Sequence, residues 1–256
     1  MGENPRGLQL TFRQRLTWFA HLFKALTRQY HTGLGQRLRG LIDADAVIVD
    51  VGAHAGQHAK LFAAMVPKGH VYAFEPGLYA LSILEIVRRW RRLGNITTVP
   101  LGLSDKPCVE TLHVPLKRSG TMGFGLSHIG ADTSGRETVS EEIRLTTLDR
   151  FVEEAALKRL DFIKVDIEGW EVNFLKGAME TIEKFKPSLL LEVMHGSLAR
   201  ASATPQQVFD LLLPLGYQPY ETFEHQGYAM RRVDGFEGEA DYLFVPREKA
   251  HLVEAR

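Results

Sequence analysis

The chain has 256 residues, 45% of them hydrophobic, which is enough for the core of one elaborated α/β domain. Its 31 basic residues balance its 31 acidic residues, so the chain as a whole has no positive field to hold duplex nucleic acid. Because it has one cysteine, no secretory signal pattern and no apolar run of about 18 residues, we expect a cytoplasmic protein without an internal disulfide or a transmembrane span.

The first 45 residues differ in composition from the rest. Residues 1–40 carry seven basic side chains and one acidic side chain. Apolar residues recur there at three- and four-residue steps, which places them on one face of a helix: Phe12, Leu16, Phe19, Leu22, Phe23 and Leu26. The pattern predicts a helical N-terminal extension over residues 1–45. Its apolar face fits three partners: the main domain, a second subunit in a homodimer, or a membrane surface contacted peripherally through residues 10–40.

From residue 46 onward, short apolar runs alternate with helical stretches, which is the pattern of β-α units around a largely parallel sheet. The runs lie at 46–51, 70–74, 96–101, 161–166 and 188–193. Apolar residues at four-residue steps from Trp170 to Ile182 predict one helix after the fourth strand. Two further runs, at 217–222 and 241–245, predict an antiparallel pair at one edge. We therefore expect residues 46–256 to form one Rossmann-like α/β domain.

A segment between the third and fourth of these strands departs from the alternation. Residues 108–114 alternate like a strand, whereas residues 118–138 are rich in glycine and aperiodic. Long irregular segments in compact domains are often lids or binding loops. We therefore expect residues 118–138 to form a mobile lid near the strand ends.

A glycine turn follows the first predicted strand. Gly52 and Gly56 are spaced as Gly-x-x-x-Gly before a helix, a setting in which a ligand approaches the backbone. The spacing lacks the Gly-x-Gly-x-x-Gly pattern of dinucleotide-binding turns. Asp50, just before the turn, would attract a cationic ligand, and the sulfonium and ammonium groups of S-adenosylmethionine fit that charge. We expect His54 to lie near the ligand as part of the loop.

Further polar residues follow the second and third strands. Glu75 ends the second strand 23 residues after Gly52, a spacing at which a carboxylate accepts hydrogen bonds from ribose hydroxyls. Pro76 fixes the direction of the chain beyond it. Ser104 and Asp105 come just past the third strand, where either would reach the amine of an adenine ring. These positions predict an adenosyl site shared by three strand ends.

The fourth strand brings two carboxylates to the edge of the sheet where ligands bind in open α/β folds. Asp166 and Glu168 lie two residues apart, and Gly169 permits a sharp turn into the next helix. Methyl transfer requires the acceptor to be positioned and its proton removed, and Asp166 is our preferred residue for both tasks. A structural role at a helix N-terminus stays open, as does Mg²⁺ binding, although no complete set of metal ligands is visible.

The fifth strand supplies a second candidate for the base. Glu192 and His195 lie at its end, and a histidine titrates in the range that is useful for proton transfer. We treat His195 as the alternative base, with Glu192 beside it. A purely structural role for both residues stays open.

Five segments together resemble the FkbM family of methyltransferases. They are Val49-Asp-Val-Gly-Ala-His-Ala-Gly56, Phe74-Glu-Pro76, Leu103-Ser-Asp105, Thr147-Leu-Asp149 and Ile163-Lys-Val-Asp-Ile-Glu-Gly-Trp-Glu171. The resemblance spans about residues 46–195. It implies a class I methyltransferase with a seven-stranded sheet, S-adenosylmethionine as methyl donor, and O-methylation of a hydroxyl on a sugar, a polyketide or a related metabolite.

Carried over by position, the resemblance assigns the cofactor-binding motifs to Asp50, Gly52, Gly56 and Glu75, and the acidic motif after the fourth strand to Asp166 and Glu168. Asp166 is therefore predicted both to contact the cofactor and to act on the acceptor. His54 occupies a place that the family usually fills with Asn, which puts side-chain contacts at this position in question.

Two other functions stay open at this point, because fold alone does not settle function. A nucleotide-binding oxidoreductase would share the sheet and the turn, although the spacing from Gly52 to Gly56 disfavours it. A catalytically silent scaffold would retain the fold and lose the reaction. The predicted acceptor is a small molecule or glycan with a free hydroxyl, and we expect no nucleic-acid partner.

Overall fold

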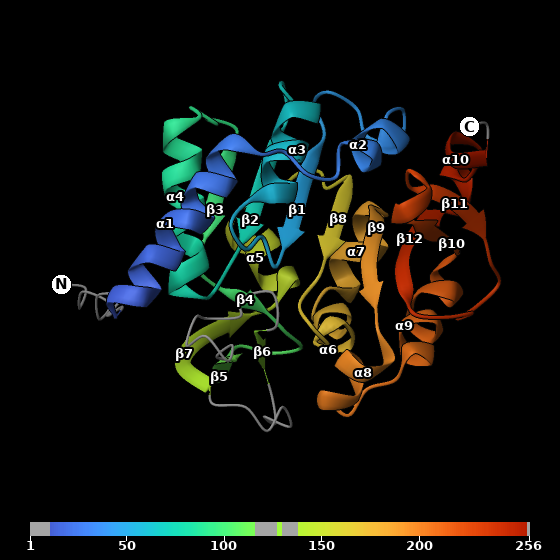
Figure 1. Ribbon diagram of the computed structural model, residues 1–256. Helices are drawn as coiled ribbons and strands as arrows, with labels where there is room; N and C mark the ends of the chain where they lie inside the picture. Colours follow the sequence, from blue (N-terminus) through green and yellow to red (C-terminus); the bar gives the residue numbers. More distant parts are fainter. Residues whose placement is uncertain (1–10, 116–126, 130–137, 255–256) are drawn as a thin grey trace.

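The structure is a computed structural model that describes residues 11–115, 127–129 and 138–254. Among these residues the main sheet has eight strands, in the order β11-β10-β12-β9-β8-β1-β2-β3 (Figure 1). Along the chain they are β1 (Val47–Val51), β2 (His70–Phe74), β3 (Ile96–Val99), β8 (Phe162–Val165), β9 (Ser188–Val193), β10 (Tyr217–Phe223), β11 (Ala229–Arg232) and β12 (Ala240–Pro246). The strands from β9 to β3 are parallel, and β12, β10 and β11 pair antiparallel. The predicted Rossmann-like fold is confirmed, and β11 extends the expected seven strands to eight.

Helices cover both faces of the main sheet. They are α1 (Phe12–Thr27), α2 (Thr32–Leu38), α3 (Gln57–Met65), α4 (Leu78–Trp90), α5 (Leu148–Glu154), α6 (Glu171–Lys176), α7 (Met179–Phe185), α8 (His195–Arg200), α9 (Pro205–Leu212) and α10 (His251–Glu254). Along β1, Ile48 packs in one cluster with residues of α2 and α3, whereas Val49 and Val51 pack in another with residues of α5, α6 and α9. A parallel strand covered on both faces is apolar along its whole length. Asp50 is the one polar residue of β1.

A second sheet has the order β4-β7-β5-β6 among the described residues. Its strands are β4 (Gly102–Leu103), β5 (Cys108–Pro115), β6 (His128–Ile129) and β7 (Thr138–Thr146). Leu112 and Leu145 pack in a cluster with α4. The alternation of residues 108–114 correctly predicted β5, whereas β7 was missed although Ile143 and Leu145 alternate with polar residues. Most of the predicted lid, residues 118–126 and 130–137, lies outside the described residues.

The single helix expected after the fourth parallel strand is two helices, α6 and α7, separated by Gly177. The backbone N–H of Asp149 donates to the carbonyl of Gly177 (3.1 Å). The Asp149 carboxylate accepts from the backbone N–H groups of Glu180 and Thr181 at the start of α7 (3.3 and 2.8 Å). This capping starts a new helix where the periodicity alone predicts a continuous one. The Thr147 hydroxyl likewise caps α5, so the Thr147-Leu-Asp149 segment has a structural role.

The described part of the N-terminal extension contains α1 and α2, and α1 packs on α4. Ala25 is buried there, and the indole N–H of Trp18 donates to Ser82 Oγ (2.9 Å). Lys60 of α3 fastens the end of α1, because its ammonium donates to the carbonyls of Ala25 and Arg28 (2.5 and 2.8 Å). Among the described residues, no helix combines the length and the hydrophobicity that a membrane span requires.

Candidate active site

The glycine turn follows β1 at the carboxyl edge of the sheet and is held to β2. The backbone N–H groups of Gly52 and Ala53 both donate to the carbonyl of Phe74 (3.1 and 2.9 Å). Gly52, His54 and Gly56 have φ angles of +75°, +49° and +83°. This left-handed region is free for glycine, and Asn, Asp and His enter it more readily than other residues. His54 therefore adopts a backbone conformation that Asn, the residue that the resemblance implies at this position, also tolerates.

Gly52 has no room for a side chain. A Cβ atom at this position would lie 2.0 Å from the carbonyl oxygen of Asp166, and the left-handed conformation costs an L-residue about 1–2 kcal/mol. We therefore expect Gly52→Ala to lower the free energy of unfolding by about 2 kcal/mol or more, measured by urea denaturation. Gly94→Ala is the control, because a Cβ atom there meets nothing within 4 Å. Equal stability of the two variants would mean that the turn adapts to a side chain.

Glu75 holds the turn from the end of β2. Its Oε2 accepts from the backbone N–H of His54 (2.8 Å) and its Oε1 from that of Gly77 (2.9 Å). Each oxygen retains a lone pair for a ligand hydroxyl. Burial raises the pKa of Glu75 to about 7, although both hydrogen bonds favour the ionised form. Glu75 therefore changes its charge near neutral pH. Only the ionised carboxylate can accept hydrogen bonds from ligand hydroxyls on both oxygens.

An apolar slot opens beside Glu75. It is lined by Val51, Gly52, Phe74, Pro76, Gly102, Leu103, Ile129, Ile167 and Trp170. These residues come from β1, β2, β4 and β6 and from the segments that follow β1, β2 and β8. Pro76, one of the predicted site residues, is part of the wall. An apolar ring fits such a lining.

Ser104 and Asp105, which the sequence assigned to one ligand contact, differ in accessibility. Ser104 is buried, and its hydroxyl accepts from the Trp170 indole (2.9 Å) and donates to Asp105 (3.0 Å). Asp105 is exposed. The one hydroxyl proton of Ser104 is already used, so Ser104 positions Trp170 in the slot wall. Asp105 retains an accessible carboxylate.

A buried lysine lies beneath the turn. The Lys164 ammonium is 3.7 Å from the carboxylate of Asp50 and 3.2 Å from that of Asp166, and it donates to the carbonyl of Gly52 (3.5 Å). Burial lowers the pKa of Lys164, but the two carboxylates outweigh it and the pKa is raised. Burial raises the pKa of Asp50 to about 6. Asp50 is fully buried, so its carboxylate faces Lys164 inside the protein. The sequence had instead predicted that this carboxylate faces a cationic ligand.

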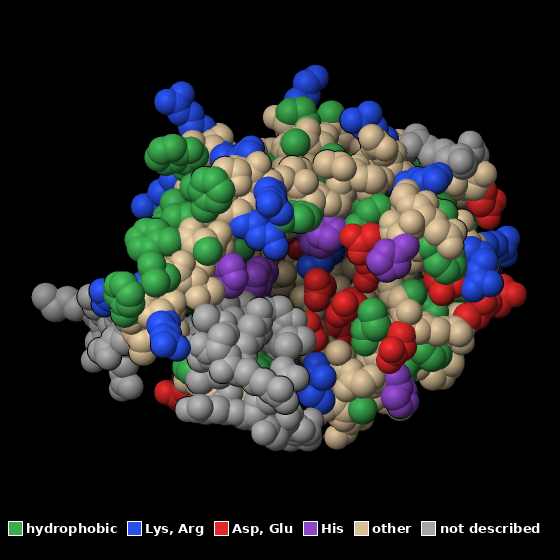
Figure 2. Space-filling model, viewed as in Figure 1, with side chains coloured by type: hydrophobic (Ala, Val, Ile, Leu, Met, Phe, Trp, Pro, Cys, Tyr) green, Lys and Arg blue, Asp and Glu red, His purple; other side chains and the backbone are tan. Residues whose placement is uncertain are grey.

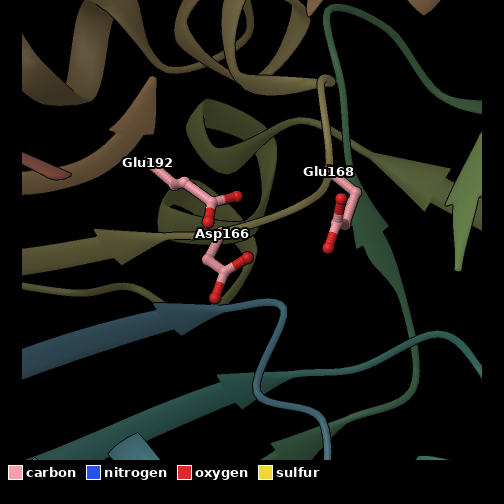
Figure 3. Close-up of side chains that lie close together, drawn as sticks. All are labelled: Asp166, Glu168 and Glu192. Atoms are coloured by element: carbon pink, nitrogen blue, oxygen red, sulfur yellow. The ribbon is translucent and has the colours of Figure 1, made fainter. Parts of the chain in front are cut away.

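Three carboxylates converge at the ends of β8 and β9 (Figure 3). One oxygen from each of Asp166, Glu168 and Glu192 lies within 4.8 Å of the other two. Arg200 donates to the carbonyl of Glu168 (2.9 Å) and pairs with its carboxylate (3.4 Å). The structure thus brings three predicted site residues into one acidic cluster. Such oxygens could hold a cationic ligand or a divalent metal ion, or accept a proton.

The acidic cluster continues onto β12 and opens to solvent. Asp241 pairs with Glu192 across β12 and β9. Burial raises the pKa of Asp241 to about 6, and burial followed by the charge of Asp166 raises the pKa of Glu192. Figure 2 shows acidic side chains gathered in a hollow near the centre of one face, with histidines close by. The hollow therefore combines negative charge with groups that change protonation near neutral pH.

His195, the alternative base predicted from the sequence, has a different setting. It begins α8 with an exposed side chain, and its backbone N–H donates to Glu239 (2.9 Å). Among the described contacts, none joins its ring to Asp166 or Glu192. The geometry therefore gives His195 no support as the base.

Two other histidines come from segments far apart in the sequence. The rings of His31, just before α2, and His58, on α3, are stacked with centroids 4.3 Å apart. His31 Nδ1 is 2.6 Å from the hydroxyl of Tyr228, which donates to Glu224 (2.9 Å). Burial lowers the pKa of His31, and the charges acting on it include Glu224 and Asp166. The charge of Asp166 thus reaches His31, whereas burial, Lys164 and His31 act on the pKa of His58.

Residues 50–219 match the methyltransferase FkbM domain. The match contains the glycine turn, Glu75, Lys164 and the three clustered carboxylates, and it continues beyond the segments that carry the resemblance in the sequence. The chain belongs to the FkbM methyltransferase family.

Relatives of this FkbM-family chain include two curated enzymes and a solved structure. The 2-O-methyltransferase NoeI of Sinorhizobium fredii is 24% identical over 217 residues, which cover 80% of this chain and 86% of NoeI. The hexuronic acid methyltransferase AglP of Haloferax volcanii is 27% identical over 143 residues, 55% of this chain and 53% of AglP. The structure of a methyltransferase FkbM from Methylobacillus flagellatus KT is 17% identical and covers 90% of this chain and 58% of that one, with a TM-score of 0.50. The last comparison supports the shared fold.

For this FkbM-family protein, sequence reasoning missed Lys164 as a site residue. The signal was present, because a lysine stands between Ile163 and Val165 in a strand that is otherwise apolar. A charge in such a strand requires a buried partner. Asp241 and His31 carried no comparable signal, since each reaches the site only through the fold.

Proposed function

We propose that this FkbM-family protein uses S-adenosylmethionine to methylate a hydroxyl group of a sugar or glycan. The observation that carries the proposal is the apolar slot between the glycine turn and Trp170, with Glu75 between two of its wall residues. The apolar lining of the slot suits an adenine ring, and the unused lone pairs of Glu75 suit the two ribose hydroxyls. The turn lacks the pyrophosphate-binding pattern, which favours this cofactor over a nicotinamide dinucleotide.

The cationic end of the cofactor fits the acidic side of the site. The side chain of Asp166 is 40% exposed, whereas that of Asp50 is fully buried. We therefore give the direct contact to Asp166, and we give Asp50 the positioning of Asp166 through Lys164. Negative charge in a partly desolvated cleft favours sulfonium and ammonium groups.

Asp166 and Glu192 are the residues that we assign to the acceptor hydroxyl. When bound, S-adenosylmethionine would supply an electrophilic methyl group: the C–O bond forms as the methyl–sulfur bond breaks, S-adenosylhomocysteine is the leaving group, and the acceptor oxygen gives up its proton. Lys164 holds the Asp166 carboxylate at 3.2 Å, so that it can orient the hydroxyl and take its proton. Glu192, whose pKa is raised by burial and by Asp166, is suited to share that proton. Glu168 is paired with Arg200 and shapes the cleft.

The sugar acceptor is supported by the relatives and by the surface of the site. NoeI is named as a 2-O-methyltransferase and AglP as a hexuronic acid methyltransferase. The hollow in Figure 2 is lined with acidic side chains, and carboxylate oxygens accept hydrogen bonds from hydroxyl groups. An acceptor with several hydroxyls fits this surface better than an apolar one.

Two measurements test the proposal in order. Calorimetric titration with S-adenosylhomocysteine and, separately, with NAD is expected to show binding of the first compound alone. Methyl-labelled S-adenosylmethionine is then offered with a panel of monosaccharides, uronic acids and glycosides, and label is expected in at least one hydroxyl. Binding of NAD in place of S-adenosylhomocysteine would overturn the cofactor assignment. Cofactor binding with no labelled product from any hydroxyl compound would favour the silent scaffold.

The charge of Glu75 makes cofactor binding depend on pH. The ribose hydroxyls donate hydrogen bonds to Glu75 when its carboxylate is ionised. Below its pKa of about 7 Glu75 carries a proton, and this proton must be lost when the cofactor binds. The affinity for S-adenosylhomocysteine is therefore expected to fall as the pH drops below about 7, by up to about tenfold per pH unit. Above that pH the affinity should level off with respect to this group.

Glu75→Gln is the variant that isolates this effect. It is expected to weaken S-adenosylhomocysteine binding at pH 8 by about 1–3 kcal/mol and to flatten the pH dependence, as followed by calorimetry across the neutral range. Glu180→Gln, at an exposed carboxylate in the first turn of α7, is the matched control and should retain the wild-type profile. An unchanged profile for Glu75→Gln would restrict Glu75 to its two backbone hydrogen bonds.

A further inference from the structure

One face of α1 carries large apolar side chains that the rest of the described molecule does not cover. The exposed fractions of Phe12, Leu16, Phe19 and Phe23 are 77%, 55%, 61% and 70%. These residues recur at three- and four-residue steps and form one continuous row, here called the α1 stripe. The sequence had placed six apolar residues on a single face, but Leu22 and the residues near it pack inward against α4. The helix therefore has an apolar side toward the protein and a second apolar side toward solvent.

The α1 stripe lies among cations. The helix contains three basic residues and no Asp or Glu. The exposed basic side chains on α1 and at the ends of α1 and α4 are Arg13, Arg15, Lys24, Arg28, Arg89, Arg91 and Arg92, of which Arg89 is ion-paired with Glu85 of α4 (3.4 Å). The two helices end side by side, because Arg91 donates to the carbonyl of Leu26 (3.2 Å), and Trp90 is also exposed (75%). A large apolar row on a helix whose charged residues are all basic, as they are in α1, is the composition of a helix that lies in a lipid interface.

The helix is fixed so that the α1 stripe stays outward. Two residues on the inner side of α1 contact α4. The Trp18 indole N–H donates to Ser82 Oγ, and His21 Nδ1 lies 3.1 Å from the Tyr79 hydroxyl. Lys60 holds the last carbonyls of the helix. Rotating α1 to bury the α1 stripe would break all three attachments. The apolar row is therefore a built surface of the folded protein.

We propose that the α1 stripe docks this protein on an anionic lipid bilayer. The Phe and Leu side chains would enter the boundary between headgroups and acyl chains, while the Arg and Lys side chains would contact lipid phosphates. A second copy of the chain is a poorer partner, because a two-fold interface would place the same basic residues against one another. α1 also lies on the outside of the fold, next to α4 (Figure 1), where a lipid surface can reach it.

The α1 stripe and the acidic hollow are visible from the same side of the molecule. In Figure 2, apolar side chains gather over α1 at the left of the face in which the hollow opens. A bilayer bound at α1 would thus lie beside the opening of the site. The docking rests on α1 alone and does not depend on the proposed reaction, so either can fail without the other.

Vesicle flotation tests the proposal with the full chain. The probes are vesicles of phosphatidylcholine alone and of phosphatidylcholine mixed with phosphatidylglycerol. The wild-type protein is expected to float with the anionic vesicles, to bind the neutral ones more weakly, and to lose the difference in high salt. Phe19→Ser/Phe23→Ser is expected to lower partitioning about tenfold or more. Lys24→Glu/Arg28→Glu is expected to abolish the preference for anionic lipid.

The control variant removes exposed apolar side chains elsewhere. Val109→Ser/Val139→Ser changes two exposed valines of the small sheet and should float like the wild type. Equal thermal melting and equal S-adenosylhomocysteine binding by all variants establish that they are folded. Wild-type protein that stays at the bottom of the gradient with anionic vesicles would overturn the proposal, as would flotation that Phe19→Ser/Phe23→Ser does not reduce. A dimer in light scattering that this variant converts to a monomer would assign the α1 stripe to a second copy instead.

Discussion

Asp166→Asn is expected to slow methyl transfer by about 10²–10⁴-fold, the usual contribution of a positioned general base. The substitution keeps the size of the side chain but removes the charge that pairs with Lys164 at 3.2 Å and the oxygen proposed to take the acceptor proton. The measurement is the rate of S-adenosylhomocysteine formation at saturating S-adenosylmethionine, with the best acceptor from the sugar panel. S-adenosylhomocysteine lacks the sulfonium charge but keeps the ammonium group, so its affinity for the variant should fall by much less than the rate does.

The matched control for this experiment is Asp210→Asn. Asp210 is exposed on α9, where its carboxylate accepts from Gln206 (2.9 Å), so the same chemical change occurs away from the cluster. The control should retain the wild-type rate. A wild-type rate in Asp166→Asn would remove Asp166 from the reaction, and Glu192 would become the residue to test. A loss of S-adenosylhomocysteine affinity as large as the loss of rate would instead assign Asp166 to the cofactor alone.

Lys164→Met is expected to lower the free energy of unfolding by about 3–5 kcal/mol. The variant leaves the fully buried carboxylate of Asp50 without the ammonium that pairs with it at 3.7 Å. A loss of this size is a large share of the roughly 5–15 kcal/mol that stabilises a protein domain. Urea denaturation of the wild type and the variant at pH 7 measures it directly.

A double variant shows whether the loss arises from this pair. Asp50→Asn/Lys164→Met removes both charges and is expected to be more stable than Lys164→Met alone, because no unpaired charge remains buried. The pH gives a second check. The pKa of Asp50 is raised to about 6 in the folded protein, so its folded form takes up a proton before its unfolded form as the pH falls. Lys164 lowers the pKa of Asp50, so in Lys164→Met this pKa lies above its wild-type value of about 6. The penalty of Lys164→Met should therefore be smallest below about pH 6, where Asp50 is protonated in both folded proteins, and grow as the pH rises above it. If the double variant is no more stable than Lys164→Met and the penalty does not change with pH, the loss of stability arises from packing rather than charge.

Much of the candidate site followed from residues near one another in the chain. Gly52 and Gly56 were identified from their spacing, and the left-handed φ angles at both positions give the physical reason for glycine. Glu75 was placed at the end of β2, and the structure adds its hydrogen bonds to the turn. The ligand contacts of these residues stay predictions. The contacts predicted for Asp50 and Ser104 had to be revised, because burial and existing partners restrict both side chains.

The succession along the chain of the main-sheet strands other than β11, the glycine turn, and the acids at the ends of β8 and β9 could be read from local patterns. Apolar periodicity and turn residues act over a few neighbours in the chain, so they are visible in it. The tertiary structure alone decided which of these groups meet. Pairing of β1 with β8 sets Lys164 opposite Asp50, and β12 brings Asp241 to Glu192. Burial and charge at a site depend on such distant partners. The exposed side of α1 also depends on one, because packing on α4 decides which apolar residues of α1 are covered.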